Sequence, residues 1–375
     1  MRVCFLVRNI SMPSGIERVT SVIANRLAEQ GVAVSIVSLW GGLEPFYPKH
    51  EAVSLHQLFS SQVRSASRWV AMLRRLGRVP LASWRLRQLL RQYPQDILID
   101  TDYLLGQVAL PAVPGMSVRH VHWEHFSFNL DLDKPHKLLG RRLIARATRG
   151  IVTLTQRDRE YWLKGARVRG EIAAIPNPVP FEMPETTYQP DTFIVLAVGR
   201  LNYQKGFDRL IESWAEMKNE KGNDVSHWTL RILGDGEEEH ELKQKAHQLG
   251  VNDSIEFLPA TKDVDHYYRN ASILAMTSRF EGFPMVLLEA QSYGLPIVAF
   301  DCDTGPAEII SDGESGFLVA QGDTHGFAHQ LASLIQDSEL RMKFSANARD
   351  SVSRFKPEAI VVQWNRYLEN LMSTK

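Results

Sequence analysis

Short apolar runs alternate with amphipathic stretches along the first half of the chain. Residues 2–7, RVCFLV, are followed by a polar loop and then by residues 16–31, which carry apolar side chains at helical spacing and end at a glycine. Further apolar runs lie at 32–39, 96–100, 151–155 and 172–177. Strands that alternate with helices in this way predict βαβ units and a parallel sheet.

The composition changes around residues 176–190, where PNPVPFEMPETTYQP holds five prolines in fifteen residues, as is typical of a linker. A second alternating series follows, with apolar runs at 192–201, 228–236, 254–260, 272–278 and 296–300. We therefore predict an α/β protein with two Rossmann-like, doubly wound domains that face each other across a cleft. The first domain is expected at residues 1–178 and the second at residues 179–356. Ligands of such sheets bind at the carboxyl ends of the strands, so the loops that follow strands carry the most information.

Length and composition limit the class of protein. A chain of 375 residues with 44% hydrophobic and 23% charged residues is typical of a soluble protein with two domains. No apolar run approaches the roughly 20 residues that span a bilayer, and the first residues are too short an apolar stretch for a signal peptide. The two cysteines, Cys4 and Cys302, lie in apolar runs and predict buried thiols rather than a disulfide framework or a metal site. A cytoplasmic protein is expected.

Charge is distributed unevenly along the chain. Residues 1–178 hold 25 Lys and Arg against 13 Asp and Glu, whereas residues 179–375 hold 18 against 30. The basic excess concentrates in residues 64–91, which contain eight arginines, no acid, and the tryptophans Trp69 and Trp84. Such a stretch is typical of a solvated helical face, a nucleic-acid patch or a surface that lies on anionic lipid. The interleaved tryptophans and leucines favour lipid over nucleic acid, with a solvated face as the alternative.

Two cations lie in AVGRLNYQKGFDRL, residues 197–210, between an apolar run and an amphipathic helix. Arg200 and Lys205 at such a loop suit a diphosphate, because their charges add to the free backbone N–H groups. The alternative is an ion-paired Arg200 and a solvated Lys205. The next strand ends at Gly234 and Gly236 without the third glycine of a dinucleotide fingerprint, which disfavours a hydride-transfer cofactor but leaves room for a nucleotide base or sugar.

Two glutamates frame the stretch RFEGFPMVLLEA, residues 279–290. Glu289 lies in a helix that is apolar nearly all round, so its carboxylate needs a partner, and two adjacent ribose hydroxyls would suit it. Glu281 precedes a turn in which Gly282 permits close approach of a ligand and Pro284 suits the first position of the helix. The alternative is a surface glutamate together with an acid that the helix dipole favours.

The same stretch resembles the E-x7-E motif of the family 4 retaining glycosyltransferases, which have the GT-B fold. The resemblance covers nearly the whole chain, through SGIERVTSVIANRLAEQG at 14–31, VGRLNYQKGFDRLIESW at 198–214 and AEIISDGESGFLV at 307–319. FKPEAIVVQWNRYLENL resembles the last helix of that fold, so residues 357–375 are expected to pack back on the first domain. The resemblance is to those members of the family that build bacterial surface polysaccharides.

The resemblance implies a role for each residue of the donor side. Glu289 would hold the ribose of a nucleotide-diphosphate sugar, expected to be UDP-linked, while Arg200 and Lys205 would neutralise the diphosphate as it leaves. Glu281 would position the donor sugar. The other expected donor-binding positions are Gly15, Gly234, Gly282, Phe283, Pro284 and Met285. No metal ion or other cofactor is implied, because two cations and a helix N-terminus take that role.

On the acceptor side, the resemblance points to VRHVHWEHFSFN, residues 118–129. In the family a histidine at the end of a first-domain strand lines the sugar pocket. His125 occupies the best-matching place and is expected to act with Glu281, Arg200 and Lys205 in catalysis, and His122 is the second choice. The sequence departs from the family pattern at Ser14, where a second glycine is frequent, and at Pro259, which replaces a frequent glycine near the base pocket.

The expected activity is transfer of a sugar, with retention of configuration, to a glycan or lipid-linked saccharide in polysaccharide or lipopolysaccharide biosynthesis. The enzyme would work in the cytoplasm or at the inner face of the membrane. Its basic first domain would contact anionic lipid there, and nucleic acid is not an expected partner. One alternative is a nucleotide-sugar 2-epimerase of the same fold, which has a different set of carboxylates. The other is a non-catalytic sugar-binding relative, which the joint presence of Glu281, Arg200, Lys205 and Glu289 argues against.

Overall fold

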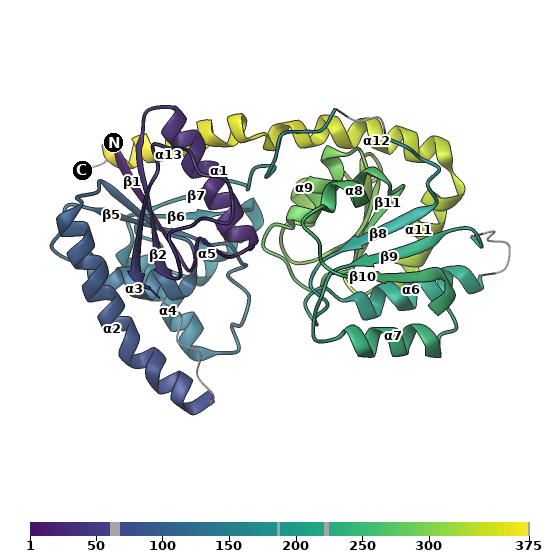
Figure 1. The fold of residues 1–375 in the computed structure, drawn as a ribbon, viewed down its shortest axis with the longest axis horizontal. Helices are drawn as coiled ribbons and strands as arrows, with labels where there is room; N and C mark the ends of the chain where they lie inside the picture. The colour runs from purple at the N-terminus through teal and green to yellow at the C-terminus, as the bar shows by residue number, and fades with distance from the viewer. Residues whose placement is uncertain (61–67, 186–187, 221–224, 374–375) are drawn as a thin grey trace. The chain divides into compact units, whose positions relative to one another are not determined.

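The computed structural model describes residues 1–60, 68–185, 188–220 and 225–373, and along residues 68–78 it describes the backbone alone (Figure 1). The chain forms two compact units. One consists of Met1–Pro180 together with Pro357–Lys375, and the other of Phe181–Lys356. Each unit is built on a parallel sheet flanked by helices, so the prediction of doubly wound α/β domains is confirmed.

Seven parallel strands form the sheet of the first unit, in the order β3-β2-β1-β4-β5-β6-β7. The strands are β1 (Arg2–Val7), β2 (Ala33–Trp40), β3 (Ser54–Phe59), β4 (Ile97–Asp100), β5 (Arg119–Trp123), β6 (Gly150–Thr153) and β7 (Glu171–Ala174). The helices are α1 (Gly15–Glu29), α2 (Arg68–Gln92), α3 (Tyr103–Ala112), α4 (Pro135–Ala147), α5 (Gln156–Gly165) and α13 (Pro357–Ser373). The strand order reverses between β1 and β4, where α/β sheets of this kind bind ligands.

Successive residues of β1 pack against helices on opposite faces of that sheet. Cys4 belongs to a core cluster that includes Leu86 of α2 and Leu105 of α3. Phe5, one residue on, packs edge-on against Trp364 of α13 with ring centroids 6.4 Å apart. A strand covered on both faces reads as a continuous apolar run, which is why the strands were visible in the sequence.

Six parallel strands form the sheet of the second unit, in the order β10-β9-β8-β11-β12-β13. The strands are β8 (Ile194–Val198), β9 (Thr229–Leu233), β10 (Ile255–Leu258), β11 (Ile273–Met276), β12 (Ile297–Asp301) and β13 (Gly316–Ala320). The helices are α6 (Phe207–Asn219), α7 (Glu239–Gln248), α8 (Val264–Arg269), α9 (Met285–Ser292), α10 (Pro306–Ile309), α11 (Thr324–Gln336) and α12 (Ser338–Val352). Here the order reverses between β8 and β11, so the loops after these two strands meet at the carboxyl edge.

Both cysteines are buried and free, as their apolar surroundings predict. Burial raises the pKa of each thiol to about 12, so both stay protonated at neutral pH. Among the described residues, no helix combines the length and the apolar character needed to cross a bilayer.

Candidate functional site

The loop after β8 carries two of the predicted cations. Arg200 lies two residues beyond β8, is exposed, and makes no ion pair with any residue that the structure describes. Lys205 reaches Glu281 instead, and its Nζ lies 2.7 Å from the Oε1 atom of that carboxylate. The fold thus brings together two predicted site residues that are 76 positions apart in the sequence.

Close backbone packing fixes this loop against the end of β11. Gly206 has a φ of 64°, and a Cβ atom at this position would collide with the carbonyl oxygen of Thr277. The Thr277 hydroxyl donates to the Gly206 carbonyl at 2.9 Å. Only glycine can adopt this positive φ so close to the Thr277 carbonyl. The backbone before α6, including that of the neighbouring Lys205, is therefore held in a fixed position.

Glu281 is buried and held through its side chain and its backbone. Its side chain is 9% exposed and pairs with Lys205, while its carbonyl oxygen accepts a hydrogen bond from the Thr304 hydroxyl at 2.5 Å. Gly305, with a φ of 104°, packs against Pro284 so closely that a Cβ atom would overlap its ring. Since a buried carboxylate without a partner costs several kcal/mol, the contact with Lys205 supplies the partner that Glu281 needs in this turn.

α9 begins at Met285, one residue later than predicted, because Pro284 is its N-cap residue and has an extended conformation with φ −72° and ψ 102°. Pro284 offers no side-chain acceptor to the first turn of the helix. Phe283 is buried and lies edge-on against Phe355, with ring centroids 5.6 Å apart. An uncapped first turn preceded by Gly282 suits an anion.

Glu289 lies on the buried part of α9 and is 8% exposed, which excludes the surface alternative. Its Oε2 atom accepts a hydrogen bond from the Tyr268 hydroxyl of α8 at 2.8 Å. Tyr268 in turn stacks on Tyr293, with ring centroids 5.3 Å apart and an interplanar angle of 12°. The sequence indicated that the carboxylate needs a partner but gave no sign of Tyr268.

Gly234 joins the loops that follow β8 and β9. A Cβ atom at this position would collide with the carbonyl oxygen of Gly199, and the Gly234 N–H donates to the Leu258 carbonyl at 2.9 Å. Close approach of two backbones therefore already requires a glycine here. The predicted role of Gly234 beside a nucleotide base or sugar stays a prediction.

Arg279 is an organising residue that the sequence did not reveal. Its guanidinium makes two bonds with the Asp208 carboxylate, at 2.8 and 2.7 Å, and donates to the Tyr203 carbonyl at 2.9 Å. The Asp208 side chain raises the pKa of Arg279. The guanidinium also lies over the Tyr203 ring, 4.1 Å from its centroid. Arg279 thereby ties the loop that carries Lys205 to the segment that carries Glu281.

In the first unit, Gly15 is the first residue of α1. Ser14 is the N-cap residue of this helix. Its hydroxyl donates to the Glu17 carboxylate and accepts a hydrogen bond from the Glu17 backbone N–H. Burial raises the pKa of Glu17. Nothing lies within 4 Å of the position that a Cβ atom of Gly15 would take, so this helix start is open to a ligand. Contact of Gly15 with the donor stays a prediction.

The two histidines proposed for the acceptor side differ in their partners. The Nδ1 atom of His122 lies 2.6 Å from Asp100, and although burial opposes its charged form, Asp100 and Glu124 raise its pKa to about 10. His125 is buried beside Trp123, at 4.3 Å between ring centroids, and burial lowers its pKa to about 3. The Nε2 atom of His125 has no hydrogen-bond partner in the described residues. His125 is thus neutral and His122 charged, and contact of either side chain with a sugar stays a prediction.

A buried charge network holds residues 124–130, the loop that carries His125. Glu124 faces His122 at 3.7 Å and Arg141 at 3.6 Å, and these cations more than offset burial and lower its pKa. Arg141 also donates to the carbonyls of Leu130 at 2.7 Å and Ser127 at 3.2 Å, so it holds residues 124–130 in place. The loop that carries His125 is therefore rigid.

The basic stretch at 64–91 is described only in part, because residues 64–67 and the side chains of 68–78 lie outside the described part. Trp84 of α2 is 57% exposed. Arg85 donates to the Leu58 carbonyl at 2.6 Å, and Arg87 donates to the carbonyls of Ala112 and Pro114 at 2.8 and 2.7 Å. These two arginines hold α2 to its neighbours, and the exposed Trp84 suits a lipid surface.

Among the residues that the structure describes, no group of three or more His, Cys, Asp and Glu side chains is placed to hold a metal ion. The expectation of a reaction without a cofactor stays a prediction.

Comparison with known proteins places both halves of the chain. Residues 13–182 match the family described as Glycosyltransferase Family 4, and residues 179–351 match the family described as Glycosyl transferases group 1. The amylovoran biosynthesis glycosyltransferase AmsD of Erwinia amylovora is 32% identical over 383 residues, which cover 98% of this chain and 99% of that protein.

Two solved structures share the fold over nearly the full length. The lipopolysaccharide outer core galactosyltransferase WaaB in its apo form aligns with a TM-score of 0.76 and 22% identity over 99% of both chains. HepE of Anabaena in complex with UDP aligns with a TM-score of 0.76 and 19% identity over 99% of this chain and 100% of that one.

Proposed function

This chain belongs to glycosyltransferase family 4, and on that premise we propose that it transfers a sugar from a UDP-linked donor to a saccharide or lipid-linked acceptor, with retention of configuration. It is a glycosyltransferase of the GT-B fold that works in polysaccharide or lipopolysaccharide biosynthesis. UDP as the donor nucleotide is supported by the UDP complex of HepE, and the acceptor class by the names of AmsD and WaaB.

One observation carries the proposal: Lys205 and Glu281 meet at 2.7 Å at the carboxyl edge of the second sheet, with exposed Arg200 on the same loop as Lys205. A diphosphate leaving group that approaches this loop meets two positive charges, and an uncapped helix start adds partial positive charge. Because negative charge grows on the diphosphate as its bond to the sugar breaks, Arg200 and Lys205 would stabilise the transition state more than the ground state.

Glu281 and Glu289 would bind different parts of the donor. Glu289 is fixed by Tyr268 on a buried helix and would accept from the two hydroxyls of the ribose. Glu281 in the turn before α9 would accept from hydroxyls of the sugar. In the first unit, neutral His125 would line the sugar pocket. The reaction as proposed uses these side chains and no metal ion.

The acceptor is proposed to be lipid-linked because the first unit is basic and displays Trp84. An anionic leaflet would attract this unit and bring it to an acceptor held in the membrane. The protein would then work at the cytoplasmic face of the membrane.

The test is incubation of the full chain with radiolabelled UDP- and GDP-sugars and a lipid extract. We expect label to move from a UDP-sugar into the lipid fraction, and loss of that transfer in Lys205→Ala. Glu256→Gln, which removes an exposed carboxylate of β10 paired with Arg231, is the matched control and should transfer normally. Epimerised nucleotide sugar without transfer would establish the epimerase alternative, and binding alone would establish a sugar-binding protein.

A further inference from the structure

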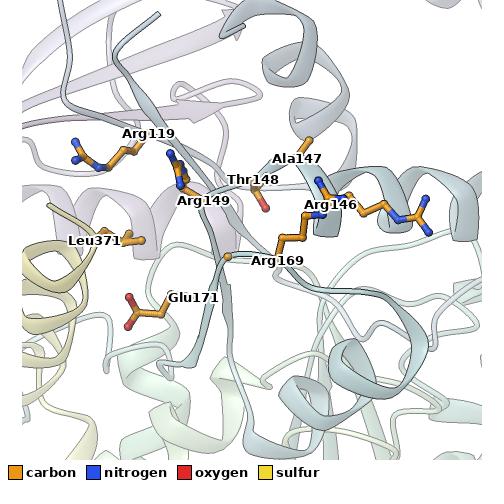
Figure 2. A pocket seen from close by; sticks show the side chains of 9 residues that line it. Arg119, Arg146, Ala147, Thr148, Arg149, Arg169, Glu171 and Leu371 are labelled. Carbon is orange, nitrogen blue, oxygen red and sulfur yellow. The ribbon is translucent and has the colours of Figure 1, made fainter. Parts of the chain in front are cut away.

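Four arginines surround a hollow at the amino ends of β5, β6 and β7. Arg119 begins β5, Arg146 lies in the last turn of α4, and Arg149 and Arg169 lie in the turns that enter β6 and β7. Figure 2 shows their side chains around the opening, with Leu371 of α13 on one side. The cavity has a volume of about 330 Å³. It lies at the amino ends of the strands. Gly15 and His125 lie at the opposite edge of the sheet, beyond the carboxyl ends.

The positive charge of the hollow is not balanced by carboxylates. None of the four arginines makes an ion pair with a residue that the structure describes, and the single acid of the lining is Glu171. Arg119 is held by Met372, whose sulfur and carbonyl oxygen lie 3.5 and 3.4 Å from its guanidinium nitrogens. Four like charges around one space repel each other, so an anion that enters gains from all of them.

A purely structural role explains the presence of one of the four arginines. Arg146 lies at the carboxyl end of α4, where a cation stabilises the helix dipole. Arg149 and Arg169 are exposed, and no such role explains them. They come from different turns and still reach the same space.

The backbone holds these two turns together. The Arg149 N–H donates to the His120 carbonyl at 2.8 Å, and the Arg169 N–H donates to the Ala145 carbonyl at 3.0 Å. Gly170 lies so close to Arg149 that a Cβ atom would collide with the carbonyl of Arg149. The two guanidinium groups therefore start from fixed points on either side of the opening, which lowers the entropy cost of binding between them.

We propose that this hollow is a second anion site, which binds a phosphate group that carries two or more negative charges. A guanidinium presents its N–H donors as a planar fork that matches phosphate oxygens, and several forks around one cavity suit a diphosphate or a phosphomonoester. The group comes either from a free phosphorylated solute or from the headgroup of a phospholipid. The site is separate from the donor site, because it lies at the amino ends of the strands, whereas Gly15 and His125 follow the carboxyl ends.

The first experiment is calorimetric titration of the full chain with inorganic pyrophosphate at low salt. Because the donor loop can bind the same probe, every protein in the series carries Arg200→Ala and Lys205→Ala. The pocket pair is Arg149→Gln with Arg169→Gln. The control pair is Arg142→Gln with Arg167→Gln, which removes the same charge from exposed arginines of the same unit that do not line the hollow.

We expect the pocket pair to weaken pyrophosphate binding by about tenfold or more, because each lost charge-assisted bond is worth at least that factor. The control pair should weaken it by less than about threefold, through long-range charge alone. Arg119→Gln provides a second test through a different strand, and thermal melts show that each variant is folded. Equal pyrophosphate affinity in the pocket pair and in the parent protein, which carries Arg200→Ala and Lys205→Ala alone, excludes a free phosphorylated solute. Failure of that parent protein to bind either pyrophosphate or phosphatidate-containing vesicles overturns the proposal.

The second experiment identifies the source of the phosphate. Sedimentation with vesicles of phosphatidylcholine containing phosphatidate is compared with sedimentation with phosphatidylcholine alone. If the pocket pair loses phosphatidate binding that the control pair keeps, the occupant is a lipid headgroup. If only pyrophosphate binding depends on the pocket pair, the occupant is a free phosphorylated solute. If neither depends on it, the hollow is not an anion site.

Discussion

Replacing Glu289 by alanine removes a nearly buried carboxylate that accepts a hydrogen bond from Tyr268 at 2.8 Å. In the proposed function the same carboxylate also accepts from two ribose hydroxyls. A hydrogen bond to a charged group is worth about 1.5–3 kcal/mol. Loss of one such net interaction corresponds to a rise in the Kd for UDP of about tenfold to a hundredfold.

Tyr268→Phe is the matched variant, because it removes the protein donor and keeps the carboxylate. We expect it to lower the free energy of unfolding by about 1.5–3 kcal/mol, since one bond to a buried carboxylate is lost. Its Kd for UDP should rise by less than about threefold, because the ribose hydroxyls still find their acceptor. The two variants thus separate contact with the nucleotide from support of the helix.

The assay is calorimetric titration with UDP, with a thermal melt of each variant to show that it is folded. A folded Glu289→Ala protein that binds UDP as tightly as the unsubstituted chain would refute the ribose contact. Equal losses in Glu289→Ala and Tyr268→Phe would also refute it, because the effect would then follow from the position of α9 rather than from the carboxylate.

Arg200→Ala and Lys205→Ala should each lower kcat for sugar transfer more than they raise KM, by about tenfold or more, and near-normal kcat in both would exclude contact with the leaving diphosphate. His122 has its pKa raised to about 10, so its contribution to stability is fully present below about pH 6.5 and is lost as pH rises towards 10. His122→Asn should remove that part of the pH dependence from thermal melts, and an unchanged slope would contradict the ion pair. Trp84→Ala should weaken sedimentation with anionic vesicles, and binding through residues 64–91 should fall as salt rises; equal binding to neutral vesicles would exclude an electrostatic contact.

The order of strands and helices and the loops of the donor site were accessible from the sequence because their signals are local. A buried parallel strand reads as an apolar run, and Arg200 and Lys205 follow such a run within a few residues. The need of Glu289 for a partner was also local, because every neighbour of it on α9 is apolar or small.

The partners themselves could not be predicted, because they depend on contacts between distant segments. Tyr268 lies 21 residues from Glu289, and Arg279 lies 71 residues from Asp208. No periodicity connects such positions, and each side chain taken alone is typical of an exposed residue. The arginine hollow could not be predicted for the same reason, since its four arginines come from three separate segments and form one site only when β5, β6 and β7 lie side by side.

The return of α13 to the first unit has a consequence for synthesis. Trp364 packs against Phe5 and against Trp123, at 6.4 and 4.8 Å between ring centroids, so the first unit is completed by a helix that is made only after the second unit. At a translation rate of about 5–20 residues per second, the aromatic face of β1 and β5 waits on the order of 10 to 40 seconds for its cover. During that interval the nascent first unit exposes an aromatic, apolar surface, and a chain truncated before α13 would keep that surface exposed.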